Sequence, residues 1–410
     1  MPLKVIVVGA GVSGLCTAVG LHRAGHSVKV FDKSRFAGQV GSAVLITPNA
    51  SLVLDRLGVD FRKARADAVD YFEVFDGISL APMTIHGLGK PDDQFGSTLY
   101  TIHRADLVNE LLRIAQGLDI QLGTKVVSAS AEEGYVVLAD GTKHYADLIV
   151  AADGVHSVLR TEVLEDESAS AASDSGISTF RFMIPTAELA KDPELNFEEL
   201  LKLRGRGCAL FADTTKDSEH HMVWFTCQDR TMQVFVGIHD SIPASEDLLK
   251  QTMLEEFGHY HPSLIRMFKY VSLRPSFILS IIDHSSHRIA PQVTDWRLDS
   301  HPPLPVWHRG KIVLIGDAAH PMLPLGAQGA NQAIEDAGAL THLLQNNETT
   351  ARLPALLASY ERVRRLRASR IQMLSKVRLG RESDVEAYTR LYADPPGSGA
   401  YETKMRKFCA

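Results

Sequence analysis

Three glycines near the N-terminus stand at a spacing that suits phosphate binding. They are Gly9, Gly11 and Gly14 in the segment GAGVSG, directly after a short apolar run over residues 4–8. In such a turn the first glycine permits a tight bend, the second lets a pyrophosphate approach the backbone, and the third lets helix and strand pack closely. The free N–H groups and positive end of the following helix then face the phosphates.

An acidic residue follows this loop at the sequence spacing that is typical of a carboxylate that binds a nucleotide ribose. The pattern predicts a helix over residues 12–24, ended by Gly25, and a second strand over residues 26–31 that stops at Asp32. An acid about 20 residues beyond such a loop can receive ribose hydroxyls. A tight turn without a ligand is the alternative, but the flanking strands and Asp32 favour a dinucleotide. The loop does not separate FAD from NAD.

Two later segments extend the same predicted sheet. Residues 145–152 are predicted to form a strand that ends at Asp153-Gly154, and residues 312–315 a strand that delivers Asp317 to the carboxyl edge. A sheet for NAD alone would be complete well before residue 310. The nucleotide domain is therefore predicted to be discontinuous, and the Asp317 carboxylate could accept a ribityl hydroxyl.

The segment after Asp317 has the composition expected beside a flat ring. Two prolines stiffen the loop because proline fixes φ, and Gly329 and Ala330 are small enough for the chain to run close to a ring. A helix from about residue 328 would point its positive end at negative charge that develops on a reduced flavin. This segment therefore favours FAD.

Composition and charge exclude several classes of protein. The chain has 410 residues, enough for two or three domains, and a net charge of −6, which argues against a basic nucleic-acid-binding face. Its four scattered cysteines form no CxxC pair, so a reduced, cytoplasmic compartment is expected. No run of about 18 apolar residues exists, so no membrane span is expected. The regularly spaced glycines interrupt the apolar N-terminus too early for a signal peptide.

These motifs together resemble the class A flavoprotein monooxygenases, and most closely their salicylate-hydroxylase-like branch. The resemblance is carried by GAGVSG (9–14), HRADL (103–107), ADGVHSVLR (152–160), GDAAHPMLPLGAQGANQAIEDA (316–337) and a C-terminal helix over residues 359–372. It implies an α/β fold, in which a discontinuous Rossmann-like FAD-binding domain carries an inserted, mostly antiparallel β substrate-binding domain and a C-terminal helix. It also implies that NAD(P)H reduces FAD, and that a flavin C4a-hydroperoxide inserts one atom of molecular oxygen into an electron-rich ring.

The resemblance gives cofactor-binding roles to residues of the first half of the chain. Asp32 would bind the adenosine ribose, Arg104 the FAD, and Asp153 both the FAD and the pyridine nucleotide. Arg104 begins a helix predicted over residues 105–115, a place that suits a phosphate or a flavin edge. Ala43 would pack near the isoalloxazine. Gln39 stands where many relatives carry an acid, so any tuning by that acid would differ here.

The second FAD site would lie in the C-terminal half of the chain. By resemblance it contains Asp317 and Ala330, with Gly329 beside them and Asn331 as a weaker candidate. The acids at 335–336 are interpreted as helix-stabilising residues in the first turns of their helix. The basic run over residues 364–370 is interpreted as a solvated helix face.

The predicted substrate side contains one candidate catalytic residue, Arg181. It lies in a strand over residues 176–185 and would hold a phenolate, carboxylate or carbonyl oxygen above the flavin; an exposed strand arginine is the alternative. His220, His221 and His239 could act as a base, although ordinary histidines are expected more often. No clustered Cys/His pattern is present, and no metal ligand is predicted.

The domain boundaries follow from these motifs. The FAD-binding domain is predicted over residues 1–68, 101–175 and 287–375, and the substrate-binding domain over residues 69–100 and 176–286. Residues 376–410 are predicted to form a C-terminal helical tail, and the Ser/Ala-rich residues 165–176 a mobile connection.

The leading interpretation is a monomer or homodimer that hydroxylates a small aromatic substrate, phenolic or salicylate-like, and binds no nucleic acid. Two alternatives stay open. One is the same chemistry on a bulkier secondary metabolite, such as indole epoxidation or oxidative dearomatisation. The other is a non-catalytic flavin-binding redox module, which would bind FAD without turnover.

Overall fold

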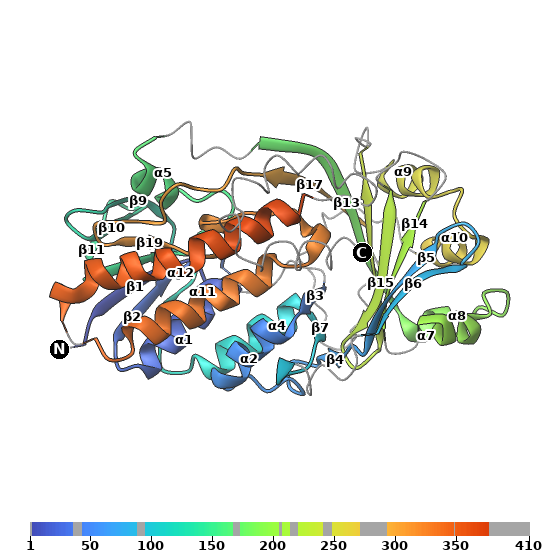
Figure 1. The fold of residues 1–410 in the computed structure, drawn as a ribbon, viewed down its shortest axis with the longest axis horizontal. Coiled ribbons are helices and arrows are strands. Elements are labelled where there is room, and N and C mark those ends of the chain that lie inside the picture. The colour runs from blue at the N-terminus through green and yellow to red at the C-terminus, as the bar shows by residue number, and fades with distance from the viewer. Residues whose placement is uncertain are drawn as a thin grey trace, which may run out of the picture.

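The structure is a computed structural model of the 410-residue chain. It describes residues 2–35, 43–87, 95–166, 173–204, 207–213, 220–240, 248–270, 293–347 and 349–376. Gln39 and the predicted tail beyond residue 376 lie outside these ranges. The molecule is elongated, with a parallel sheet and its helices at one end and a larger sheet at the other (Figure 1).

A mostly parallel sheet forms the N-terminal end of the molecule. Among the described residues it has six strands in the order β18-β19-β12-β1-β2-β8. Only the short edge strand β18 runs antiparallel. Strands β12 and β19, far apart in the chain, pair in register from Ile149 with Ile312. The strands are β1 (Lys4–Val8), β2 (Ser27–Phe31), β8 (Asp119–Gln121), β12 (Leu148–Ala151), β18 (His308–Arg309) and β19 (Ile312–Leu314).

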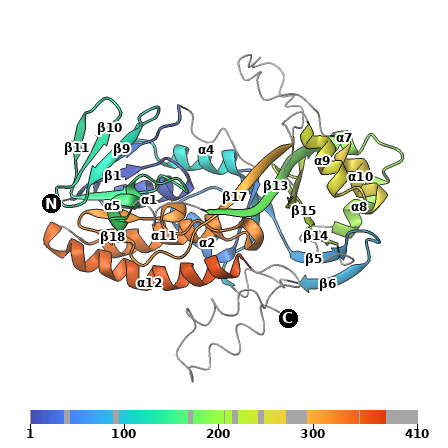
Figure 2. The same cartoon turned by 90° about the horizontal axis from the view of Figure 1, so that it is seen from above.

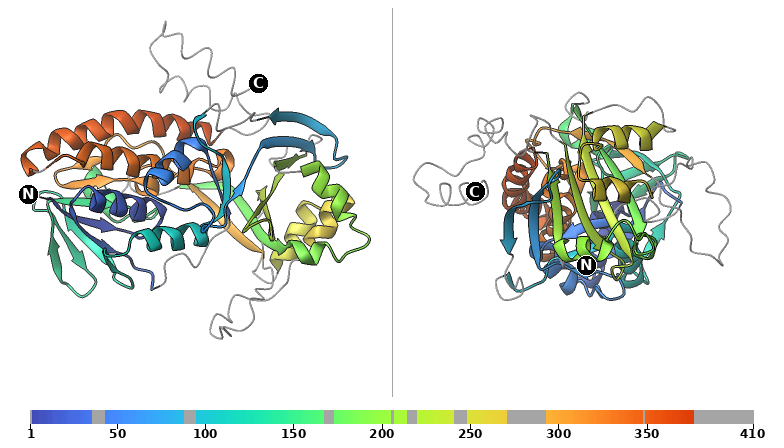
Figure 3. Two further views of the ribbon diagram at one scale, coloured as in Figure 1. Left: turned by 90° about the horizontal axis from the view of Figure 1, so that it is seen from below. Right: turned by 90° about the vertical axis from the view of Figure 1, so that its right-hand side faces the viewer.

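Helices cover this sheet because its strands are apolar on both faces. Helices α11 and α12 run side by side along the molecule, with α1 between α11 and the sheet (Figures 2 and 3). The helices of this part are α1 (Val12–Arg23), α2 (Pro48–Arg56), α4 (Arg104–Ile114), α5 (Leu159–Leu164), α11 (Gly329–Leu344) and α12 (Leu353–Leu374), and short 3-10 turns lie at Gly316–Ala318, Pro324–Gly326 and Thr350–Arg352.

Small residues let these helices pack closely. A Cβ on Gly20 of α1 would lie 2.3 Å from Oγ1 of Thr341 in α11. A Cβ on Gly338 of α11 would lie 3.1 Å from both methyl carbons of Val53 in α2. Part of the small-residue composition of α11 is therefore explained by helix packing rather than by a ligand.

Two smaller sheets flank the parallel sheet. An antiparallel sheet of β9 (Val126–Ser130), β10 (Tyr135–Leu138) and β11 (Lys143–Tyr145) lies at the N-terminal end of the molecule (Figure 2). The other joins β3 (Ala43–Ile46), β7 (Tyr100–His103) and β4 (Asp67–Ala68). In this sheet Ala43 is paired with His103, the residue before Arg104.

The larger sheet has the described order β17-β13-β16-β15-β14-β5-β6 and is antiparallel except where β14 pairs with β5. Helices α7, α8, α9 and α10 cover its outer face (Figure 2). Its elements are β5 (Tyr71–Asp76), β6 (Pro82–Gly87), β13 (Ser173–Pro185), β14 (Cys208–Ala212), β15 (His221–Cys227), β16 (Met232–His239), β17 (Thr294–Ser300), α7 (Thr186–Leu189), α8 (Phe197–Arg204), α9 (Leu249–Glu256) and α10 (Pro262–Phe268).

Alternation along the strands separates the two faces of this sheet. Phe180, Phe182 and Trp224 belong to the core under the covering helices. Met183 and Val236 instead pack with a second apolar group that includes Ala43 and Leu99 from the first half of the chain. Since side chains alternate along a strand, Arg181 shares the face of Met183, which is turned toward the parallel-sheet end.

Two local expectations need correction. Strand β13 begins at Ser173, so the last four residues of the predicted mobile connection are part of a strand. That strand is held by hydrogen bonds to β17, which the sequence did not reveal. The sequence after the Asp153-Gly154 turn predicts a short helix from about residue 155, whereas helix α5 begins at Leu159. In the part of the chain that the structure describes, no helix has the length and apolarity needed to cross a membrane.

Candidate active site

A cavity of about 300 Å³ opens at the carboxyl edge of the parallel sheet. This is the edge at which ligands of such sheets collect. Its lining comes from the ends of β1, β2 and β12, from the turn after β19, and from the first residues of α1, α4 and α11. The lining residues are Val8, Gly9, Gly11, Val12, Ser13, Phe31, Asp32, Lys33, Arg104, Thr124, Lys125, Val126, Ala152, Asp153, Gly154, His156, Val158, Asp317, Gly329, Ala330 and Ala333.

The three glycines of the first loop are subject to different constraints. Gly9 has φ +108°, and a Cβ there would lie 2.2 Å from the carbonyl oxygen of Ala152. A Cβ on Gly14 would lie 1.9 Å from the carbonyl oxygen of Gly9, and Gly14 does not line the cavity. Gly11 has φ −74°, and a Cβ there would meet no protein atom within 4 Å. The fold itself thus requires Gly9 and Gly14, whereas Gly11 leaves space for a group inside the cavity.

Two helices direct their N-termini at this cavity. Gly11, Val12 and Ser13 of α1 and Gly329 and Ala330 of α11 all line it. Neither helix has a side-chain cap or an acidic residue in its first turn. The first N–H groups of an α-helix lack intrahelical partners and carry positive partial charge. The cavity is therefore suited to a group with phosphates or developing negative charge.

Asp32 and Asp153 line the cavity and also shape its walls. The Asp32 carboxylate accepts hydrogen bonds from the backbone N–H groups of Ala10 (2.6 Å) and Ser34 (2.7 Å). Asp153 accepts from the Ser157 hydroxyl (2.6 Å) and the Val158 N–H (2.9 Å). Burial raises the pKa of the Asp153 carboxyl, although these hydrogen bonds oppose the shift. Both carboxylates hold their own loops in shape as well as facing the cavity.

Asp317 lies between the buried residues Gly316 and Ala318, but its own side chain is exposed to the cavity. Burial raises the pKa of this carboxyl, and the positive charges of Arg104 and Arg160 only partly offset the rise. Such a carboxylate is stabilised when a ligand hydroxyl donates a hydrogen bond to it. Arg104, at the start of α4, lines the same cavity.

Arg160 joins two of the cavity turns and was missing from the sequence-predicted site. Its fully buried guanidinium donates to the carbonyl oxygens of Asp317 (2.8 Å), Ala318 (2.8 Å) and Val155 (2.9 Å). It therefore holds the turn after β12 against the turn after β19. The sequence could have identified this arginine, because it is the last residue of the ADGVHSVLR motif.

A buried ionic network holds the Asp317 turn from behind. The Asp336 carboxylate accepts from the backbone N–H of Gly316 (2.9 Å) and from Nε of Arg364 (2.8 Å), and its Oδ2 bonds Nε2 of His320. Burial alone would raise the pKa of Asp336, but His320 and Arg364 outweigh it and hold that pKa below the usual range. Gly316, with φ +58°, is thereby fixed in the left-handed region.

This network overturns two interpretations made from the sequence. Asp336 and Glu335 are not in the first turn of α11, and both pair with Arg364 of α12. Arg364 is 4% exposed, so the basic run of α12 is not wholly a solvated face. Arg367 of the same run is half-exposed and pairs with Glu335.

Besides Gly14, two of the predicted cofactor residues lie outside the cavity lining. Ala43 is buried at the start of β3, where it packs with the apolar group beneath the larger sheet. Asn331 is fully buried. Its amide accepts from the Thr47 N–H (2.9 Å) and donates to the carbonyl oxygens of Leu45 (2.9 Å) and Ala327 (2.7 Å). Asn331 thus ties β3 and the following turn to α11.

Arg181 lies on β13, on the face turned toward the parallel-sheet end. Burial and the positive charge of Arg104 lower the pKa of its guanidinium. Its Nε atom is buried and has no hydrogen-bond partner among the described residues, while the guanidinium carbon lies 5.9 Å from the Trp296 ring centroid. Two guanidinium groups whose charges repel each other favour an anionic or hydrogen-bond-accepting ligand between them.

The three candidate histidines are distributed over both faces of the larger sheet. His239 is buried under the helices, where it stacks on Phe180 and pairs with Asp295 (3.1 Å). His220 is also on the helix side, near Phe257. His221 is on the opposite face, and burial lowers its pKa to about 4, so it is neutral near pH 7.

Sequence reasoning also missed several residues of the cavity wall. These are Ser13, Lys33, the segment at 124–126, and His156. Lys33 directly follows Asp32 and His156 lies three residues after Asp153, so proximity along the chain could have found them. The segment at 124–126 carries no recognisable motif, and only the fold places it beside the end of β2.

Comparison with known proteins defines the family. The model of the "FAD binding domain" family matches residues 2–258 and 292–375. The FAD-dependent monooxygenase phomE′ of Diaporthe leptostromiformis is 31% identical over 84% of this chain and 85% of its own length. Hispidin-3-hydroxylase of Neonothopanus nambi is 30% identical over 89% of this chain and 86% of its own length.

A solved structure leads to the same family. A salicylate hydroxylase in its substrate complex superposes with a TM-score of 0.72 at 26% identity, covering 98% of this chain and 92% of that one. The chain therefore belongs to the FAD-binding-domain family and, within it, to the flavoprotein monooxygenases, which confirms the resemblance seen in the sequence. FAD is its cofactor, and the non-catalytic flavin-binding module is disfavoured.

Proposed function

We propose that FAD binds along the cavity from the glycine loop to the start of α11. Its pyrophosphate would lie against Gly11 and the N-terminus of α1, and its adenosine ribose at Asp32. A ribityl hydroxyl would donate to Asp317, and Gly329 and Ala330 would face the ring. The support for this placement is the uncapped helix ends, the open space at Gly11, and the Asp317 carboxylate that lines the same cavity.

We also propose the division into domains that the sequence suggested. The parallel sheet and its helices would bind FAD, and the larger sheet with α7–α10 would bind the substrate. The separate apolar cores of the two parts support this division. The β3–β7–β4 sheet and its apolar contacts to β14, β15 and β16 would form the junction between them.

The function best supported is hydroxylation of a small aromatic substrate at the expense of NAD(P)H and molecular oxygen. The observation that carries it is Arg181, a half-buried cation with an unsatisfied Nε on an otherwise apolar stretch of β13 and β16 that faces the FAD side. Met183 and Val236 on that face would contact the ring of the substrate. Bound FAD, once reduced, supplies the oxygen-activating chemistry.

In this proposal Arg181 orients and activates the substrate. Its guanidinium would hold a phenolate, carboxylate or carbonyl oxygen by charge-assisted hydrogen bonds. Stabilising phenolate character makes the ring a better nucleophile toward an electrophilic oxygen. The apolar face would exclude water and so strengthen this interaction. Arg104 adds a second positive charge on the side of the FAD cavity.

The test compares Arg181→Gln with Arg297→Gln. Arg297 lies on the neighbouring strand β17, but it is exposed and pairs with Asp174. Ligand binding is followed by the change in flavin absorbance, using phenols, benzoates and the uncharged amides of those benzoates. Arg181→Gln should retain FAD and weaken the best anionic ligand by about 10- to 100-fold, the loss of one hydrogen bond to a charged group. Arg297→Gln should bind as the wild type does. Equal binding by all three proteins would remove Arg181 from the site.

The bulkier secondary-metabolite substrate remains a second candidate. It is favoured by hispidin-3-hydroxylase, whose name gives a hydroxylase of hispidin and which matches most of the chain. Larger phenols and indoles therefore belong in the same ligand panel.

A further inference from the structure

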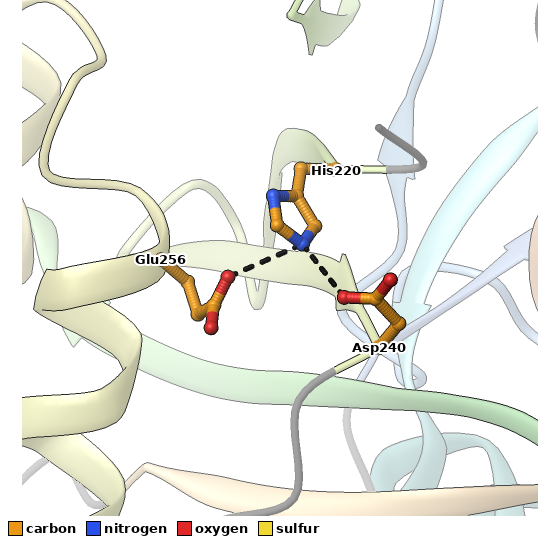
Figure 4. A group of neighbouring side chains, drawn as sticks. All are labelled: His220, Asp240 and Glu256. Carbon is orange, nitrogen blue, oxygen red and sulfur yellow. Dashed lines mark hydrogen bonds and ion pairs between the residues drawn. The ribbon is translucent and has the colours of Figure 1, made fainter. Parts of the chain in front are cut away.

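Three metal-ligating side chains meet on the helix-covered side of the larger sheet, away from the FAD cavity. His220 directly precedes β15, Asp240 directly follows β16, and Glu256 is the last residue of α9. Figure 4 shows the carboxylates of Asp240 and Glu256 directed at the same ring nitrogen of His220. The three ligand atoms all lie within 4.8 Å of one another.

The distances suit a shared cation better than a pair of strong hydrogen bonds. Nε2 of His220 is 3.2 Å from Oδ1 of Asp240 and 3.2 Å from Oε2 of Glu256. Charge-assisted hydrogen bonds are shorter, about 2.7–2.9 Å. Two ligand atoms bound tetrahedrally to Zn²⁺ at about 2.05 Å would be separated by roughly 3.3 Å. The two separations from Nε2 are close to this value, and the two carboxylate oxygens lie within 4.8 Å of each other.

One imidazole cannot satisfy both carboxylates. The single N–H at Nε2 of His220 cannot point straight at both carboxylates. The Glu256 side chain is 23% exposed. Among the described residues, the ion pairs of Asp240 and Glu256 all go to His220. Two negative charges thus face one weakly basic ring, a charge imbalance that a divalent cation would cancel with the imidazole neutral.

We propose that His220, Asp240 and Glu256 form a binding site for a first-row divalent metal ion of the Zn²⁺ type. Each residue supplies one ligand, and Asp240, 64% exposed, leaves the remaining coordination positions open to water. A nitrogen ligand favours Zn²⁺ and its neighbours over Mg²⁺ and Ca²⁺, which prefer oxygen ligands alone. The sequence showed no such site because its members are separated by 20 and 16 residues.

The role of this metal would be structural. The ion would connect the start of β15, the end of β16 and the C-terminus of α9, and so fix α9 on the sheet. Met253 of α9 and Phe257, which directly follows α9, belong to the apolar core under the helices. An ion that binds the folded but not the unfolded chain raises the unfolding temperature. This proposal does not depend on the flavin chemistry, because Arg181 lies on the opposite face of the sheet.

The experiment uses the full-length, FAD-loaded protein after treatment with a chelator. Zn²⁺ is titrated by calorimetry, and Tm is measured with and without Zn²⁺, Mg²⁺ and Ca²⁺. The expected result is one high-affinity Zn²⁺ per chain and a Tm that rises with Zn²⁺ but not with Mg²⁺ or Ca²⁺. A wild-type protein that binds no Zn²⁺, or whose Tm rises equally with all three ions, would overturn the proposal.

Matched variants identify the ligands. His220→Gln and the isosteric Glu256→Gln should each weaken Zn²⁺ binding at least tenfold and abolish the rise in Tm. His259→Gln is the control, because His259 pairs with a single carboxylate, that of Asp213, at 2.8 Å. Flavin content and circular dichroism check that each variant is folded. Unchanged affinity in both His220→Gln and Glu256→Gln would mean that other surface groups bind the ion, and the proposal would be wrong.

Discussion

At the scale of single residues, Gly11 separates the demands of the ligand from those of the fold. The neighbouring glycines of its loop are fixed by contacts below 2.3 Å that any Cβ would make with the backbone, whereas Gly11 has ordinary dihedral angles and open space beside it. The sequence motif predicted all three positions, but it could not show that they have different physical reasons. Only the three-dimensional structure of the backbone distinguishes the reasons for the three glycines.

Gly11→Ala should fold normally and bind FAD poorly. The new methyl group meets no protein atom, so stability should change by less than about 1 kcal/mol. The same methyl group would occupy the space proposed for the pyrophosphate, and FAD affinity should fall at least tenfold. Thermal unfolding of the apoprotein and a flavin titration measure the two effects. Gly14→Ala is the comparison: it should fail to fold stably, and a stable Gly14→Ala protein would contradict the packing described.

Asp317→Asn should stabilise the apoprotein while weakening FAD binding. The pKa of Asp317 is raised by burial, so its ionised form costs folding free energy at any pH above that pKa. The gain in Tm should therefore be largest near pH 7–8 and shrink as the pH falls toward the raised pKa, where the wild-type carboxyl is protonated too. FAD affinity should drop by about 10- to 100-fold, because a hydrogen bond to a charged acceptor is lost. A less stable apoprotein with normal FAD affinity would show that Asp317 has a different role.

At the scale of elements, the pairing of α11 with α12 fixes the turn that presents Asp317. Asp336 of α11 holds the Gly316 N–H, and Arg364 of α12 compensates its charge. The acids of α11 and the basic run of α12 were each interpreted from the sequence as features of a single helix. A helical pattern records spacing along its own axis but not which side chains of another helix face it, so this network could not be predicted.

Arg364→Met should destabilise the protein by about 3–5 kcal/mol, because it removes one of the two cationic partners of the fully buried Asp336 carboxylate and leaves only His320. Arg367→Met, which removes a half-exposed partner of Glu335, should cost no more than about 1 kcal/mol. Urea unfolding measures both values. In the double variant Asp336→Leu, Arg364→Met part of the stability should return, since the buried carboxylate is gone, although His320 and the Gly316 N–H then lose their acceptor. Equal losses of unfolding free energy in Arg364→Met and Arg367→Met would mean that the buried Arg364–Asp336 pair stabilises the protein no more than the half-exposed Arg367–Glu335 pair.

At the scale of the whole molecule, two sheets meet so that the cavity proposed to bind FAD lies toward the arginine-bearing apolar face of the larger sheet. The return of the chain to the parallel sheet after residue 310 was predictable, because a buried strand followed by Gly-Asp repeats the pattern of the earlier strands. The arrangement of the larger sheet was not. Its strand order depends on pairings such as β13 with β17, which lie more than 100 residues apart and carry no motif.

Nicotinamide oxidation by the FAD-loaded protein is the most direct test of whether this protein hydroxylates an aromatic substrate. NADH and NADPH are each offered with a panel of phenols, salicylates, larger phenolic metabolites and indoles in the presence of ¹⁸O₂, and the products are weighed by mass spectrometry. At least one compound is expected to accelerate oxidation and to leave with a single ¹⁸O atom, and Arg181→Gln is expected to lose this coupled turnover while retaining its flavin. A flavin that no nicotinamide reduces with any compound, or a product without ¹⁸O, would contradict this expectation.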